Sequence, residues 1–97
     1  MFKGKDKTIP REFALHQNYP NPFNPITNIE FDIAERTRVR LEVYDVLGRV
    51  VGVVVDEELD AGRYVYRFNG VGLSSGVYYC VMRAGRFVDV KKMMLVK

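Results

Sequence analysis

The residues of this chain that could do chemistry are few and widely separated. Nucleophilic catalysis needs a serine, threonine or cysteine within reach of a base, yet the chain has one histidine, His16, and one cysteine, Cys80. Ser74 and Ser75 lack the G-x-S-x-G frame of a nucleophile elbow. One histidine and one cysteine are also too few for the usual structural zinc site. The sequence therefore predicts no enzyme, no cofactor and no metal.

Acidic side chains could act as a pair or bind a cation. The candidates for the two carboxylates of a glycosidase are Asp45, Asp56, Asp60 and Asp89, but nothing in their spacing pairs them. Residues 56–60 form the most acidic stretch, which lacks the ligand spacing and the loop glycine of an EF-hand. We expect this stretch to be a solvated turn.

The motifs that could bind a ligand are also weak. Residues 69–76 are rich in glycine, but they lack the lysine of a P-loop and a strand pattern follows them. Tyr44, Tyr78 and Tyr79 could form an aromatic platform for carbohydrate, although packing within a sheet is the favoured interpretation. The formal net charge of +3 is spread along the chain, so no nucleic-acid partner is expected.

Length and composition predict one folded domain. The chain has 97 residues, 47% of them hydrophobic, and no apolar run approaches the roughly 20 residues of a membrane span. Residues 1–12 are polar and rich in lysine, and they indicate a linker or a remnant of cloning; residues 13–97 form the expected domain. No secretory signal peptide is recognisable at this end. The lone Cys80 is expected to be buried.

Alternation of apolar and polar residues predicts strands throughout the domain. Residues 27–33 and 38–44 show a period of two, and the short connection between them suggests antiparallel neighbours. Further strands are expected at 49–55, 63–68, 77–83 and 87–96. Short, regularly spaced strands without a helix pattern predict an all-β fold, an antiparallel immunoglobulin-like β-sandwich of about seven strands.

Glycines and valines mark special positions in this pattern. Asp45 and Gly48 occupy the first and fourth positions of an expected type I turn, and Gly62 and Gly76 are expected in turns. Gly52 interrupts a valine-rich strand, which indicates a bulge or a close approach of the backbone. Residues 53–55 are either buried on both faces or part of an edge strand covered by a partner.

Residues 17–25 (Q-N-Y-P-N-P-F-N-P) organise the chain. Three prolines exclude a helix or a central strand, so this segment is expected to be an irregular, stiffened ribbon. The rings of Tyr19 and Phe23 are expected to pin it to a sheet, and its asparagines to bond to nearby backbone groups. The structural motif comprises Asn18, Pro20, Asn21, Pro22, Phe23, Asn24 and Pro25.

The order of the sequence blocks resembles a known family. L-x-Q-N-Y-P-N-P-F-N-P-x-T at 15–27 is followed by V-Y-D-V-L-G-R at 43–49, A-G-x-Y at 61–64, L-S-S-G-V-Y-Y at 73–79 and K-K-M at 91–93. This order resembles the type A C-terminal sorting domain of the bacterial type IX (Por) secretion system. That family in turn resembles the immunoglobulin-like module of flagellar hook-capping proteins.

The resemblance implies a secretion signal at the C-terminus of a larger exported cargo protein. Such a protein would reach the periplasm and be passed by an outer-membrane translocon to the cell surface. A sortase would remove the domain, upstream of Leu15, and attach the cargo to lipopolysaccharide. The resemblance places the contact with this machinery at Lys91, Lys92 and Met93. The alternative is an uncleaved accessory module, which binds carbohydrate or protein or acts as a spacer on a secreted hydrolase.

Overall fold

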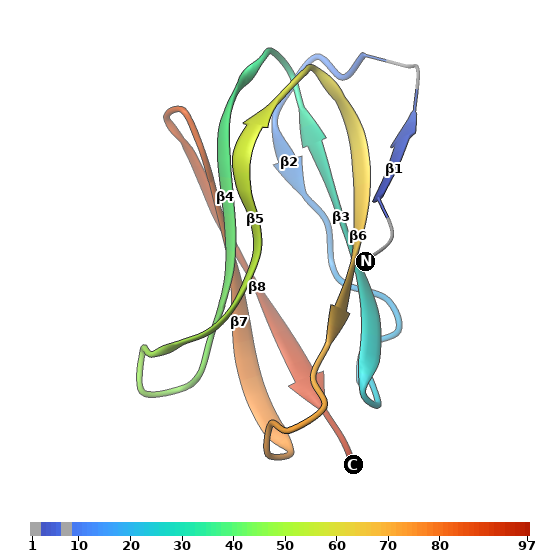
Figure 1. The fold of residues 1–97 in the computed structure, drawn as a ribbon, viewed down its shortest axis with the longest axis vertical. Coiled ribbons are helices and arrows are strands. Elements are labelled where there is room, and N and C mark those ends of the chain that lie inside the picture. Colours follow the sequence, from blue (N-terminus) through green and yellow to red (C-terminus); the bar gives the residue numbers. More distant parts are fainter. Residues whose placement is uncertain (1–2, 7–8) are drawn as a thin grey trace.

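The structure, a computed structural model, describes residues 3–6 and 9–97, and within them it contains eight strands and no helix. Two twisted sheets face each other as a β-sandwich (Figure 1). The strands are β1 (Lys3–Asp6), β2 (Ala14–Leu15), β3 (Ile26–Ile33), β4 (Thr37–Tyr44), β5 (Val50–Leu59), β6 (Gly62–Asn69), β7 (Gly76–Ala84) and β8 (Phe87–Leu95). The all-β sandwich expected from the sequence is confirmed.

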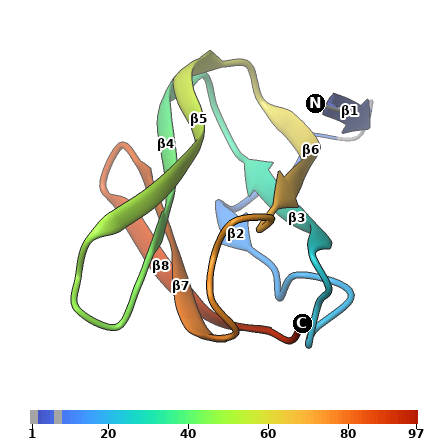
Figure 2. The ribbon, with the colours of Figure 1, turned by 60° about the horizontal axis from the view of Figure 1, so that its bottom comes forward.

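The order of strands differs from the expectation in one respect. One sheet has the order β1-β6-β3-β2 and the other β5-β4-β7-β8, and all the pairs are antiparallel (Figure 2). The expectation that β3 and β4 are neighbours was wrong, because the chain crosses from one sheet to the other between them. A period of two identifies the face that a strand buries, but it does not identify the partner strand.

The core lies between the sheets and is rich in aromatic rings. Phe31 stacks on Tyr64 and on Tyr66, with ring centroids 5.4 and 5.6 Å apart. Offset aromatic pairs of this kind add to the stabilisation that comes from burying their area. The largest side chains that are fully buried are Phe23, Ile29, Phe31, Ile33, Leu41, Tyr64, Met82, Met93 and Leu95.

Two core tyrosines also form hydrogen bonds to the loops that precede their strands. The Tyr64 hydroxyl donates a hydrogen bond to the carbonyl of Asp60 (2.7 Å), and the Tyr78 hydroxyl donates to the carbonyl of Ser74 (2.6 Å). Each bond reaches back four residues along the chain, as in the tyrosine corner of immunoglobulin-like domains. The ring fills the core and the hydroxyl fixes the start of the strand.

The turn expected at Gly48 and the bulge expected at Gly52 are both present, whereas Gly62 and Gly76, also expected in turns, are the first residues of β6 and β7. Gly48 donates its amide to the carbonyl of Asp45 (3.1 Å) and has a φ of 81°, which disfavours a side chain there. Irregularities in the β4–β5 register lie on both sides of Gly52. A Cβ atom at Gly52 would lie 3.0 Å from the Phe68 ring, so the backbone also approaches closely here.

The acidic stretch is part of a strand, so the expectation of a solvated turn was wrong. β5 continues to Leu59, and its carboxylates lie opposite the arginines of β4 and of the segment before it. Arg38 and Arg40 both bind Asp56, at 2.9 and 2.6 Å. Arg38 and Arg40 lie 18 and 16 positions from Asp56 in sequence, a pairing that local spacing does not reveal.

Glu42 is a buried carboxylate on the outer face of this sheet. It is 3% exposed, and it forms ion pairs with Arg40 (2.9 Å) and Arg83 (3.2 Å) and accepts a hydrogen bond from the Tyr44 hydroxyl (3.1 Å). The hydrogen bond from Arg40, more than any other contact, lowers the pKa of Glu42 below its usual value of 4.5. The folded state therefore favours the ionised form.

This arrangement predicts a loss of stability in acid. Because the pKa of Glu42 is lower in the folded state, its contribution is present above pH 4.5 and is lost as the pH falls through the folded-state value. The free energy of unfolding of Glu42→Gln should therefore be lower than that of the wild type at neutral pH, and the difference should shrink in acid. Urea unfolding as a function of pH measures both. A difference that stays constant down to acid pH would contradict this role.

Part of the segment expected to be a linker takes part in a sheet. β1 pairs with β6, from Lys3 opposite Tyr66 to Asp6 opposite Arg63. The remainder of the described segment, residues 9–12, leads into β2.

Candidate functional site: the proline ribbon and the edge of the last strand

Residues 17–25, here called the proline ribbon, lie along the outer edge of β8. Phe23 pairs with Leu95 as an isolated parallel bridge: its amide donates to the carbonyl of Met94 (2.8 Å), and its carbonyl accepts from the amide of Val96 (2.9 Å). Two side chains continue this contact. The Asn21 carbonyl oxygen accepts from the Met94 amide (2.9 Å), and the Gln17 amide donates to the carbonyl of Lys92 (2.7 Å).

The ribbon is anchored in the core by one of its two rings. Phe23 is 1% exposed and meets Phe68 edge to face, with centroids 6.2 Å apart. Tyr19, the second expected anchor, is 47% exposed, so it attaches the ribbon to β3 at the surface and not in the core: its backbone bridges Asn28, with hydrogen bonds of 3.0 and 2.9 Å. Its hydroxyl donates to Glu30 (3.3 Å) at the surface.

Hydrogen bonds of the buried Asn18 side chain fix the conformation of the proline ribbon. The Asn18 side-chain amide is buried and donates to the Pro20 carbonyl (3.2 Å) and to the Thr27 hydroxyl (3.0 Å), and its oxygen accepts from Gln17 (2.7 Å). The Thr27 hydroxyl donates to the same Pro20 carbonyl (2.9 Å). The peptide bonds before Pro20, Pro22 and Pro25 are cis. The local side-chain-to-backbone bond expected of the asparagines is confirmed for Asn18, whereas the Asn21 side chain bonds to Met94, 73 positions away.

Removing the Asn18 network should destabilise the domain. Asn18→Ala leaves the buried Thr27 hydroxyl and the Pro20 carbonyl with fewer partners, and we expect the free energy of unfolding to fall by about 1–3 kcal/mol. Asn24, in the same ribbon, is exposed, so Asn24→Ala should change it by less than about 0.5 kcal/mol. Urea unfolding of the two variants provides the comparison. Equal effects would show that burial of Asn18 is energetically unimportant.

The ribbon covers only one part of the β8 edge. Lys92, Met94 and Val96 use their outward backbone groups in the contact, and by alternation Val88 and Val90 face the same edge. The Val90 amide donates to the side chain of Asp89 (2.8 Å). Among the described residues, Val88 and the Val90 carbonyl have no backbone partner on this side.

The three expected contact residues are placed very differently. Lys92 is exposed, and Lys91 is half-buried with its ammonium 3.4 Å from Asp89. Met93 is fully buried in the core, so its side chain is not available to a partner in the folded domain. Gln17, which the sequence analysis did not single out as a site residue, contacts the same part of β8.

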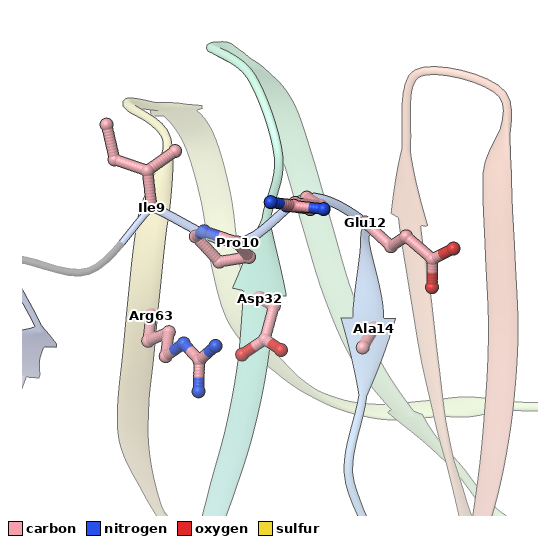
Figure 3. A pocket seen from close by; sticks show the side chains of 7 residues that line it. Ile9, Pro10, Glu12, Ala14, Asp32 and Arg63 are labelled. Carbon is pink, nitrogen blue, oxygen red and sulfur yellow. The ribbon is translucent and has the colours of Figure 1, made fainter.

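The candidate catalytic residues do not form a catalytic centre. His16 donates from Nε2 to the Asp32 carboxylate (3.1 Å). Asp32 and its register partner Arg63 line an open hollow of about 540 Å³ at the end of the sandwich (Figure 3). Among the residues that the structure describes, no serine, threonine or cysteine lines this hollow.

The other chemical candidates are dispersed. Ser74 and Ser75 lie in the loop before β7, and Ser75 accepts a hydrogen bond from the Lys97 amide (3.0 Å). Asp45 is bound by the amides of Leu47 and Arg49. Within residues 9–97, no three histidine, cysteine or acidic side chains cluster as metal ligands.

Cys80 should be unreactive in the folded domain. It is 1% exposed, and burial raises the pKa of its thiol to about 12. The thiolate is the reactive species, so iodoacetamide at pH 8 should label Cys80 in urea and leave it unlabelled in buffer. Mass spectrometry checks the extent of labelling. Fast labelling in buffer would mean that β7 opens readily.

Two of the three tyrosines of the possible aromatic platform lie together on one face of a sheet. Tyr78 is buried, whereas Tyr44 and Tyr79 are register partners on the outer face of their sheet. They line a shallow hollow of about 420 Å³ together with Val81, Arg83 and Val88, among others.

Comparison with known proteins agrees with the resemblance seen in the sequence. None of the described residues form a helix long and apolar enough to cross a membrane. No curated protein matches the chain. The family model described as a secretion system C-terminal sorting domain matches residues 17–97, which include the proline ribbon and β3 to β8. The chain therefore belongs to the family of type IX secretion C-terminal sorting domains.

Proposed function

We propose that this domain acts without catalysis, as a secretion signal. Proteins of the secretion machinery bind it at the edge of β8. The observation that carries the proposal is the partial cover of that edge. The ribbon occupies it from Lys92 to Val96, and Val88 and the Val90 carbonyl have no backbone partner on this side among the described residues. Open strand edges accept a partner strand through main-chain hydrogen bonds.

The charges beside the open edge would provide specificity. Lys92 is exposed, and Lys91 is adjacent to it with Asp89 as its partner. We infer that an outer-membrane translocon component binds Lys91 and Lys92. Met93 contributes to recognition only by stabilising the fold. A sortase would then cut upstream of Leu15 and leave the cargo at the cell surface or free outside the cell.

A reporter assay tests this proposal. Residues 13–97 are fused behind a fluorescent reporter that has its own export signal, in a bacterium that has type IX machinery. Lys91→Glu/Lys92→Glu should retain the reporter in the periplasm, while Lys97→Glu, also exposed, should be displayed normally. Circular dichroism of both variants confirms that the domain folds. Normal display of a folded double variant would refute recognition through these lysines.

Removal of the domain by a sortase is tested by a separate measurement. For this test the reporter is fused to residues 1–97, which include the segment upstream of Leu15; if a sortase removes the domain, mass spectrometry of the displayed reporter should find no peptide from residues 15–97. Display of the intact fusion would instead favour the uncleaved accessory module. Tyr44 and Tyr79, side by side on one sheet face, favour carbohydrate as the ligand of such a module. In that case Tyr79→Ala would abolish binding in a glycan array.

A further inference from the structure

β5 forms the opposite edge of the sheet that ends in β8. It pairs with β4 on one side, and among the described residues Val50–Val55 have no other backbone partner. These six residues contain no charge and no proline, two of the devices that protect an edge strand from pairing, although a third device, the bulge, is present beside Gly52. Val50 and Val53 are 46% and 50% exposed. The edge is therefore suited to accept another strand.

A groove lies directly beside this edge. It has a volume of about 400 Å³, and it runs between β5 and the end of β6. Gly52 contributes no side chain, and the Phe68 ring lies where its Cβ would be, with Cε1 3.0 Å away. The residues that line the groove are Ile26, Gly52, Val53, Val54, Arg67, Phe68 and Asn69. A mostly apolar hollow of this size accommodates an aliphatic side chain.

The rim of the groove is positively charged. Arg67 is exposed, and it forms no ion pair with any other residue among 9–97 whose contacts the structure describes. Asn69 lies at the same end and uses its oxygen to accept from the Val71 amide (2.9 Å). A ligand with a carboxylate near its apolar side chain would complement this rim.

We propose that the β5 edge binds an extended peptide segment of another protein as an added strand. The segment places an aliphatic side chain in the groove over Phe68 and a carboxylate against Arg67. Main-chain bonds to β5 supply affinity, and the groove and Arg67 supply specificity, as in other cases of strand addition. This site is distinct from the β8 edge and does not depend on recognition there.

Peptide titration followed by NMR tests the site. The probe is a capped heptapeptide in which valine alternates with threonine and the central threonine is replaced by aspartate; the control carries lysine instead of aspartate. At millimolar concentration, the aspartate peptide should shift the amides of Val50–Val55 and Phe68 and protect them from exchange. Arg67→Glu should weaken it roughly three- to fivefold, as expected for an exposed ion pair, and should favour the lysine peptide.

Other outcomes would overturn the proposal. No shift along β5, or shifts confined to β8, would mean that this edge does not accept the peptide. Shifts that grow with protein concentration before any peptide is added would assign the edge to a second copy of the chain. Equal binding of both peptides to wild type and Arg67→Glu would remove the role given to Arg67.

Discussion

Replacing Phe23 by alanine is expected to lower the free energy of unfolding by about 3–5 kcal/mol, the range for truncating a buried aromatic ring. Phe23 is 1% exposed, packs against Phe68, and bridges the ribbon to Leu95. The loss therefore combines a cavity in the core with a weakened attachment to β8. Urea unfolding followed by circular dichroism measures it.

Tyr19 supplies the matched control within the same ribbon. It is also aromatic, but it is 47% exposed, so Tyr19→Ala should cost less than about 1 kcal/mol. The Val96 amide, which donates to the Phe23 carbonyl, should exchange with solvent faster in Phe23→Ala than in Tyr19→Ala. Similar losses in both variants would contradict the anchoring role of Phe23.

The second large effect is expected at Met93. Met93→Ala should lower the free energy of unfolding by about 2–5 kcal/mol, because its side chain is fully buried between the sheets. Lys92→Ala, one residue away on the exposed face, should change it by less than about 0.5 kcal/mol. Thermal unfolding of the two variants checks the difference.

These two residues also separate folding from recognition. A sorting defect in Met93→Ala should be relieved at a temperature at which the variant is folded. A defect in the double lysine variant should persist at every temperature at which it is folded. A Met93→Ala domain that is folded and still fails to sort would show that Met93 itself contacts the machinery.

Local patterns in the sequence predicted the strands and their buried faces well. The alternation in β3, β4, β6 and β8 survives in the structure because one face of each strand must be buried. The same alternation could have predicted that the Met93 side chain is buried. Met93 shares the parity of Phe87 and Leu95, which point into the core, whereas Lys92 shares that of Val88 and Val90, which face outward.

Contacts between distant segments could not be predicted in this way. Asp56 lies in a strand opposite Arg40 and forms ion pairs with both Arg38 and Arg40, and no local spacing shows that pairing. Phe23 and Tyr19 look equivalent in the sequence, but only Phe23 meets a neighbour from β6. The position of the ribbon on β8 joins residues more than 70 positions apart, so it depends on the whole fold.

The prediction for the valines at 53–55 was partly correct. Two alternatives were open for residues 53–55, burial on both faces or an edge that a partner covers. In the structure Val54 and Val55 are buried while Val53 is half exposed, and β5 is an edge strand. The bulges beside Gly52 shift the alternation locally, which explains why adjacent valines are both buried.

The location of an exported reporter tests the central claim most directly. A reporter with an export signal is compared with the same reporter fused to residues 13–97, in a bacterium that has type IX machinery, by protease accessibility at the cell surface. The fused reporter should be accessible outside the cell, and the unfused reporter should stay in the periplasm. Periplasmic retention of the fused reporter, with the domain folded, would contradict the central claim.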